Sequence, residues 1–197
     1  MKVEGIEEVV FPEMYRIKQG FSKEKIEDLP GVINTELGKM NLSNLINPGD
    51  SVAITAGSRG IGGISDVLKN IVKEVKKAEG EPFIVPAMGS HGGATAEGQK
   101  EVLIGYGITE DYVGAPIKSS METVKVGETD FGLPVFMDKN AYQADAIIPV
   151  NRIKVHTDFH GKTESGILKI LAIGLGKQKG ASTIHNHGLK GLKDYIP

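Results

Sequence analysis

The sequence contains no cysteine. The protein therefore has no disulfide, no thiolate metal ligand and no cysteine nucleophile, and a metal would have to be bound by histidine, carboxylate or an external ligand. No charge sign dominates either, because 23 basic residues face 25 acidic residues, for a formal net charge of -2. This balance gives no reason to expect a polyanionic partner, so nucleic acid binding is not expected.

Long apolar runs are missing as well. The N-terminus is acidic and lacks the basic and apolar regions of a secretory signal. No apolar stretch approaches the ~18 residues that suggest a membrane-spanning helix. We therefore expect no membrane association and a cytoplasmic location. The length of 197 residues allows one substantial hydrophobic core.

A regular alternation of β-rich and amphipathic runs begins after the turn signal at 47–50. The order strand, glycine loop, helix occurs twice, first over 51–55, 57–63 and 64–78 and then over 82–86, 89–93 and 95–106. Three further β-rich runs follow, at 124–126, 134–137 and 146–150. This alternation predicts an α/β fold, with a largely parallel Rossmann-like sheet and helices on both faces. We expect residues 1–50 to form a lead-in segment and residues 51–197 to form the α/β domain.

The first glycine loop carries Arg59, in the run Ala-Gly-Ser-Arg over 56–59. Ligands of parallel sheets bind at the carboxyl ends of the strands, where this loop is expected. Its backbone N–H groups and the Arg59 guanidinium suit a phosphate or a carboxylate, although a surface arginine in a structural turn gives the same pattern. The loop also resembles the glycine fingerprint of short-chain dehydrogenases, but no tyrosine here has the lysine four residues later that those enzymes need.

The second glycine loop carries His91, between Gly-Ser and Gly-Gly. Neighbouring glycines have no side chains to pack against an imidazole, so His91 is expected to be exposed or to face a ligand. It is a candidate acid, base or metal ligand. Thr95 follows as a plausible N-cap of the next helix, with Gln99 close behind.

Four of the five histidines lie in the segment 151–187. The polar residues His156, Asp158 and His160 alternate as in a strand or an extended loop, which fits either a metal site or a solvated polar loop. Lys169 has apolar residues on both sides. It either extends out of a helix to solvent or lies in a pocket of low polarity, where a lowered pKa would make it a nucleophile.

Taken together, these motifs resemble the N-terminal domain of the nickel-dependent lactate racemase family. The similarity extends over about 50–190 and depends on the order and spacing of five motif positions, which are Arg59, His91, His156, Lys169 and His185. The resemblance implies a nickel pincer cofactor, which is a nicotinic-acid-derived mononucleotide with thiocarbonyl arms, joined through a thioamide to Lys169. The single protein ligand of the nickel would be His185, sixteen residues later.

The resemblance also implies the other roles in the site. Arg59 would bind the substrate carboxylate, and His91 and His156 would be the paired acid and base, with His160 as the alternative to His156. Further contacts to the cofactor would come from Gly57, Ser58, Ser165 and Gly166. The reaction implied is racemisation or epimerisation of a lactate-like 2-hydroxy acid by a hydride shuttle. A C-terminal lobe would complete the pocket, and separate maturation proteins would make the cofactor.

Three other functions remain open on the sequence. A metal-dependent hydrolase would bind zinc or manganese through His156, Asp158, His160 and either His185 or His187, with no adduct on the lysine. A non-catalytic phosphate- or nucleotide-binding module would use only the two glycine loops. A short-chain dehydrogenase would bind NAD and transfer hydride without nickel.

Overall fold

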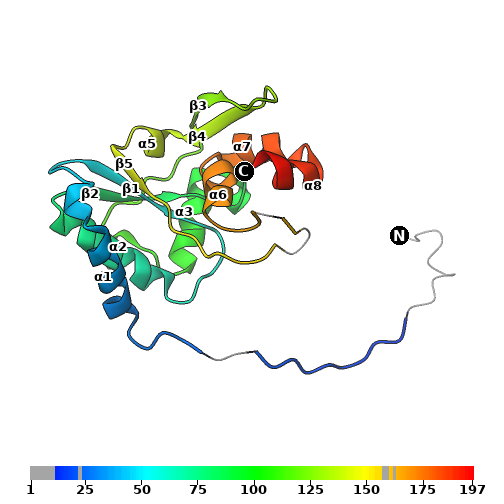
Figure 1. Cartoon of the computed structure of the whole chain (residues 1–197), viewed down its shortest axis with the longest axis horizontal. Coiled ribbons are helices and arrows are strands. Elements are labelled where there is room, and N and C mark those ends of the chain that lie inside the picture. Colours follow the sequence, from blue (N-terminus) through cyan, green and yellow to red (C-terminus); the bar gives the residue numbers. More distant parts are fainter. Residues whose placement is uncertain (1–11, 22–23, 157–159, 162) are drawn as a thin grey trace.

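The protein has the predicted α/β architecture (Figure 1), as seen in a computed structural model that describes residues 12–21, 24–156, 160–161 and 163–197. Its main sheet has the strand order β2-β1-β5, with β1 at Ser51–Ala56, β2 at Glu81–Pro86 and β5 at Ala146–Ile148. Both pairings are parallel, which confirms the parallel arrangement predicted from the alternating pattern.

The other two strands form a separate hairpin. β3 at Thr123–Glu128 and β4 at Pro134–Asp138 pair antiparallel, with a register shift between Lys125 and Gly127. Their connection is far shorter than the dozen or more residues that a parallel crossover requires. It turns at Gly132, whose φ of 75° lies in the left-handed region that glycine adopts without strain. These predicted strands therefore form, but outside the parallel sheet.

Helices cover the sheet and form the C-terminal end of the chain (Figure 1). The α-helical segments are α1 Leu29–Met40, α2 Ile64–Lys77, α3 Ala96–Gly105, α4 Glu110–Val113, α5 Lys139–Tyr142, α6 Ile167–Lys169, α7 Lys177–His185 and α8 Gly188–Lys190. Two short 3-10 turns, η2 Leu42–Asn44 and η3 Gly92–Ala94, and two π-helical turns, η4 Ile170–Gly174 and η5 Gly191–Tyr195, complete the elements. Across the described residues, each helix is too short or too polar to cross a membrane.

The core lies on both faces of the sheet, because successive side chains of β1 point to opposite sides. Val52 and Ile54 pack in the cluster that includes α2, whereas Ala53 packs in a second cluster with η4. The polar exception is Thr55, which is fully buried. Its hydroxyl accepts a hydrogen bond of 2.9 Å from the N–H of Val150 and so joins the exit of β5 to the end of β1.

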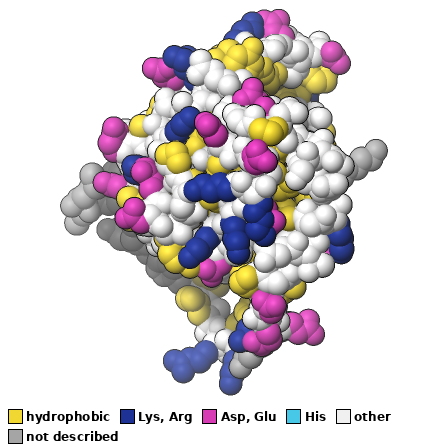
Figure 2. All heavy atoms as spheres, turned by 90° about the vertical axis from the view of Figure 1, so that its left-hand side faces the viewer, with side chains coloured by type: hydrophobic (Ala, Val, Ile, Leu, Met, Phe, Trp, Pro, Cys, Tyr) yellow, Lys and Arg dark blue, Asp and Glu magenta, His cyan; other side chains and the backbone are white. Residues whose placement is uncertain are grey.

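Two regions lie apart from this core. Residues 12–21 and 24–28 form an exposed, extended arm that leads into α1 (Figure 1). On the face drawn in Figure 2, lysine and arginine side chains gather near the centre among scattered acidic side chains. No histidine of the described residues is visible there, in keeping with a histidine-rich site elsewhere on the molecule.

Candidate active site

The Arg59 loop leaves the carboxyl end of β1, and the His91 loop leaves the carboxyl end of β2. Because these strands are parallel neighbours, both loops lie at the same edge of the sheet. The Arg59 loop is held from α3 by the Tyr106 hydroxyl, which donates a hydrogen bond of 2.6 Å to the carbonyl oxygen of Ser58. Arg59 itself is exposed and can reach a ligand at this edge.

The His91 loop has the tight backbone that its glycines allow. Gly92 has a φ of 64°, and a Cβ at this position would lie 2.6 Å from the carbonyl carbon of Gly98. The Thr95 hydroxyl accepts a hydrogen bond of 3.0 Å from the N–H of Gly98, which confirms Thr95 as the N-cap of α3. His91 directly precedes Gly92, and its side chain is exposed.

The electrostatic surroundings of His91 identify its neighbours. Its pKa is lowered mainly by partial desolvation and then by electrostatic interaction with Arg59, Lys169 and His185. Such interactions are strongest over short distances. Three other predicted site residues, from the loop after β1, from α6 and from the end of α7, thus act electrostatically on His91.

Lys169 connects this group to the fifth residue. It ends α6, directly before the π-helical turn η4, and its side chain is half-buried. Its Nζ lies 3.0 Å from Nε2 of His156. The sequence allowed Lys169 either to extend to solvent or to lie in a pocket. In the structure its side chain is partly enclosed and lies beside an imidazole.

Glu164 contacts the two preceding histidines, His156 and His160, in different ways. Its carboxylate accepts hydrogen bonds from the backbone N–H groups of His156 and Gly161, and the first of these is the main reason that the Glu164 pKa is lowered. The same carboxylate lies 3.4 Å from Nδ1 of His160, whose side chain is 88% exposed. His160 therefore pairs with Glu164 near solvent, whereas His156 contacts Lys169.

The remaining predicted cofactor contacts lie in two segments, the first glycine loop and the residues just before α6. Ser165 forms an isolated antiparallel bridge with Lys154, and the carbonyl oxygen of Gly166 accepts a hydrogen bond of 2.7 Å from the side chain of Asn151. In the first loop, a Cβ on Gly57 would lie 3.8 Å from the Ile170 side chain. The glycine loop that carries Ser58 thus lies against the helical turn that follows Lys169.

One further cluster, of three buried polar side chains, was not expected from the sequence. Lys177, Asp138 and Gln99 are fully buried, with Nζ of Lys177 lying 3.2 Å from Oδ2 of Asp138 and 3.0 Å from Oε1 of Gln99. Desolvation lowers the pKa of Lys177, and the Asp138 charge opposes this shift. In the sequence, Lys177 stands among glycines and other polar residues and resembles a surface position.

A site with several protein metal ligands does not form in the part of the chain that the structure describes. No three histidine, aspartate or glutamate side chains there come close enough to share a metal ion. Asp158, one ligand of the hydrolase hypothesis, lies outside the described residues. The His187 ring makes an edge contact with the Tyr195 ring, with centroids 5.1 Å apart.

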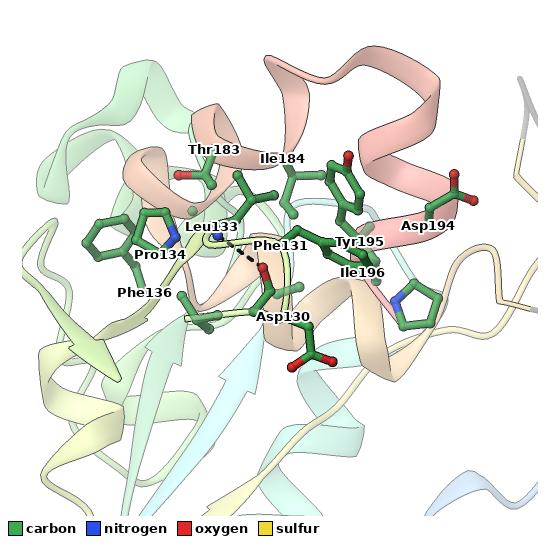
Figure 3. Close-up of a pocket in the computed structure, with 15 residues that line it drawn as sticks. Asp130, Phe131, Leu133, Pro134, Phe136, Thr183, Ile184, Asp194, Tyr195 and Ile196 are labelled. Atoms are coloured by element: carbon green, nitrogen blue, oxygen red, sulfur yellow. Dashed lines mark hydrogen bonds between the residues drawn. The ribbon is translucent and has the colours of Figure 1, made fainter. Parts of the chain in front are cut away.

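A cavity of about 370 Å³ lies elsewhere, between the β3-β4 hairpin and the C-terminal turns (Figure 3). Its walls are largely apolar, and Phe131 from the hairpin lies beside Tyr195 with ring centroids 5.2 Å apart. None of the grouped arginine, histidine and lysine side chains lines it. We therefore place the candidate active site at the ionisable cluster and not at this cavity.

Comparison with known families identifies a match over most of the chain. The family model of the lactate racemase N-terminal domain matches residues 6–193. This match confirms the resemblance inferred from the five motif positions. No curated protein matches the chain.

Proposed function

Because the chain belongs to the lactate racemase N-terminal domain family, we propose that it racemises or epimerises a lactate-like 2-hydroxy acid, using a nickel pincer nucleotide attached to Lys169. The observation that carries the proposal is the contact of 3.0 Å between Lys169 and His156, together with the electrostatic action of Arg59, Lys169 and His185 on His91. After desolvation, the groups that lower the His91 pKa are an arginine, a lysine and an imidazole. Such surroundings suit an anionic nucleotide together with an anionic substrate.

The residues present also fit the proposed cofactor. A metal already held by carbon and sulfur donors of the cofactor needs only one imidazole from the protein, and His185 at the exposed end of α7 offers it. The Lys169 amine, which is half-buried and contacts His156, would be the point of covalent attachment. When bound, the cofactor would accept the hydride from the carbinol carbon of the substrate and return it.

The protein residues would control orientation and proton transfer. Arg59 would hold the carboxylate of the substrate, so that the rest of the molecule turns about a fixed point. A planar keto acid can take hydride back on either face, so the two hands of the alcohol need proton acceptors on different sides. His91 and His156 come from separate loops and would provide them. The lowered pKa of His91 keeps its imidazole neutral, and hence basic, near neutral pH.

We also propose that His156, and not His160, is the second acid or base. The contact of 3.0 Å between His156 and Lys169 supports this choice, as does the pairing of the exposed His160 with Glu164. Gly57, Ser58, Ser165 and Gly166 would contact the nucleotide. The C-terminal lobe of the family would close the pocket, and maturation proteins would supply the cofactor.

Metal analysis combined with peptide mass spectrometry tests the proposal. The full-length protein would be produced with and without the cofactor-making proteins, as wild type, as Lys169→Ala and as Lys179→Ala. Lys179 is an exposed lysine of α7 and serves as the matched control. We expect nickel and an added mass on the Lys169 peptide in matured wild type and in Lys179→Ala, and neither in Lys169→Ala.

Other outcomes would favour the competing functions. Zinc or manganese with an unmodified Lys169 would overturn the proposal in favour of a hydrolase. Absence of any metal from the fully matured protein would overturn it in favour of a phosphate- or nucleotide-binding module. Nickel without racemisation of any 2-hydroxy acid would retain the cofactor and refute the substrate class.

A further inference from the structure

Lys177 is the largest side chain that is completely buried among the described residues. Its ammonium group has three partners, which are the carbonyl oxygen of Pro86, Oε1 of Gln99 at 3.0 Å and Oδ2 of Asp138 at 3.2 Å. An ammonium group has three N–H donors and no acceptor. Two of these partners accept hydrogen bonds from the ammonium group, while Asp138 is its ion-pair partner, so both charge and geometry hold the group in place.

Each partner of Lys177 belongs to a different element around the site. Pro86 ends β2, directly before the His91 loop, and Gln99 lies in α3, directly after that loop. Asp138 ends β4. Lys177 itself begins α7, the helix that ends at His185. One buried charge thus joins both flanks of the His91 loop to the helix that carries the proposed nickel ligand.

Gln99 extends this connection to His91. Its side-chain Nε2 donates hydrogen bonds of 2.8 Å to the carbonyl oxygen of Gly89 and 3.2 Å to the carbonyl oxygen of His91. The two ends of an amide are nearly equal in shape, but an ammonium group can only donate. Lys177 therefore forces the oxygen of Gln99 toward itself, which leaves the NH₂ group facing the two carbonyl oxygens of the loop.

Packing alone does not require this arrangement. A buried ion pair often contributes no more net stability than apolar side chains of similar size, because desolvation offsets the Coulomb attraction. The φ of Lys177 is 53°, in the left-handed region that is unfavourable for a non-glycine residue. The backbone is thus held in an unfavourable conformation that places the ammonium group between the three elements.

We propose that Lys177 and Gln99 are positioning residues that hold His91 toward Lys169 and His185 through the bridge Lys177–Gln99–His91. The catalytic consequence rests on the proposed racemase function. The geometric consequence does not, because the bridge consists only of protein groups and can be observed without cofactor.

The test uses Gln99→Met, which keeps the size of the side chain and removes the bridge, with Gln178→Met as the matched control. Gln178 is exposed and adjacent to Lys177. In the cofactor-free protein we expect Gln99→Met to change the NMR chemical shifts of the His91 ring. The N–H groups of Gly89 and His91 bond to the carbonyl oxygens of Gly174 and Met88, and a loop loosened by loss of the bridge should open these bonds more often. We therefore expect both amides to exchange with solvent about tenfold faster. The control should leave both unchanged.

A double variant, Lys177→Met with Asp138→Asn, removes the ammonium group without leaving an unpaired buried carboxylate. We expect the same changes at His91, which a purely local effect of residue 99 would not produce. In the matured enzyme, both variants should lower kcat about tenfold or more with KM changed less than about twofold, as expected for misplacement of a proton-transfer group.

The outcomes separate the two proposals. Unchanged His91 shifts and exchange in either folded variant would overturn the positioning role, whatever the activity. If the variants show the expected NMR changes but the matured wild-type protein takes up no nickel and racemises nothing, the positioning role is supported and the racemase function is refuted. A higher KM with an unchanged kcat in these variants would refute the proposed effect on proton transfer.

Discussion

Replacement of Gly174 by alanine should weaken the contact between the π-helical turn η4, which follows Lys169, and the His91 loop. Gly174 ends η4, and its carbonyl oxygen accepts a hydrogen bond of 3.1 Å from the N–H of Gly89. A Cβ on Gly174 would lie 2.6 Å from the carbonyl oxygen of Ala87 and 2.9 Å from a side-chain carbon of Ile170. The first of these is a backbone atom at the exit of β2, so it cannot move aside as a side chain would.

The magnitude follows from two opposing effects. Overpacking of a buried site costs roughly 1–3 kcal/mol, and the rigid backbone neighbour favours the upper half of this range. Alanine regains at most about 1 kcal/mol through its higher helix propensity. We therefore expect Gly174→Ala to lower the free energy of unfolding by about 1–2 kcal/mol. For a chain of this size that corresponds to a Tm lower by roughly 2–8 °C.

Urea unfolding followed by circular dichroism measures this change. The matched control is Gly38→Ala in α1, where a Cβ would meet no atom within 4 Å. Because only propensity acts there, the control should raise the free energy of unfolding by about 0.5–1 kcal/mol. Equal or greater stability of Gly174→Ala relative to wild type would refute the close approach of η4 to the end of β2.

Two further predictions concern the loops of the site. Arg59→Met should raise the pKa of His91, measured by NMR titration, because it removes one of the positive charges that lower it. The same lowered pKa means that the unfolded chain binds more protons than the folded protein as the pH falls below the ordinary value of about 6.5. His91 therefore lowers the free energy of unfolding as the pH falls below about 6.5 and has no such effect at higher pH. Arg59→Met should lessen this loss of stability. An unchanged His91 pKa in this variant would place Arg59 away from His91. Tyr106→Phe removes the hydrogen bond to Ser58 and should cost about 1 kcal/mol in urea unfolding. It should also raise KM for the 2-hydroxy acid, and identical KM and stability would show that the bond does not hold the Arg59 loop.

Several parts of the fold followed directly from local patterns. Apolar residues at helical spacing over 64–78 predicted α2, and the glycines around His91 indicated that this residue could not be packed in the core. Thr95 was recognisable as an N-cap because its hydroxyl acts on a neighbour only three residues away. Such features depend on a few consecutive residues, so a single sequence contains them.

The pairing of distant segments could be predicted from the sequence only in part. The runs that became β3 and β4 were recognised as strands, but the sequence did not show that they leave the main sheet and form a hairpin. The expected metal-like alternation of His156 with His160 gave no indication that Glu164 would bind the backbone of one and pair with the ring of the other. These outcomes depend on which segments meet in space.

The α/β class, the glycine loops and the order of ionisable residues that identifies the family can be recognised from the sequence, because each is a matter of residue type and spacing. The distance of 3.0 Å between Lys169 and His156 and the burial of Lys177 depend instead on how remote segments fold together. A lysine in a polar, glycine-rich run looks like a surface residue in any local view. Its burial becomes favourable only when Pro86, Gln99 and Asp138, which are remote in the chain, fold around it and satisfy its charge.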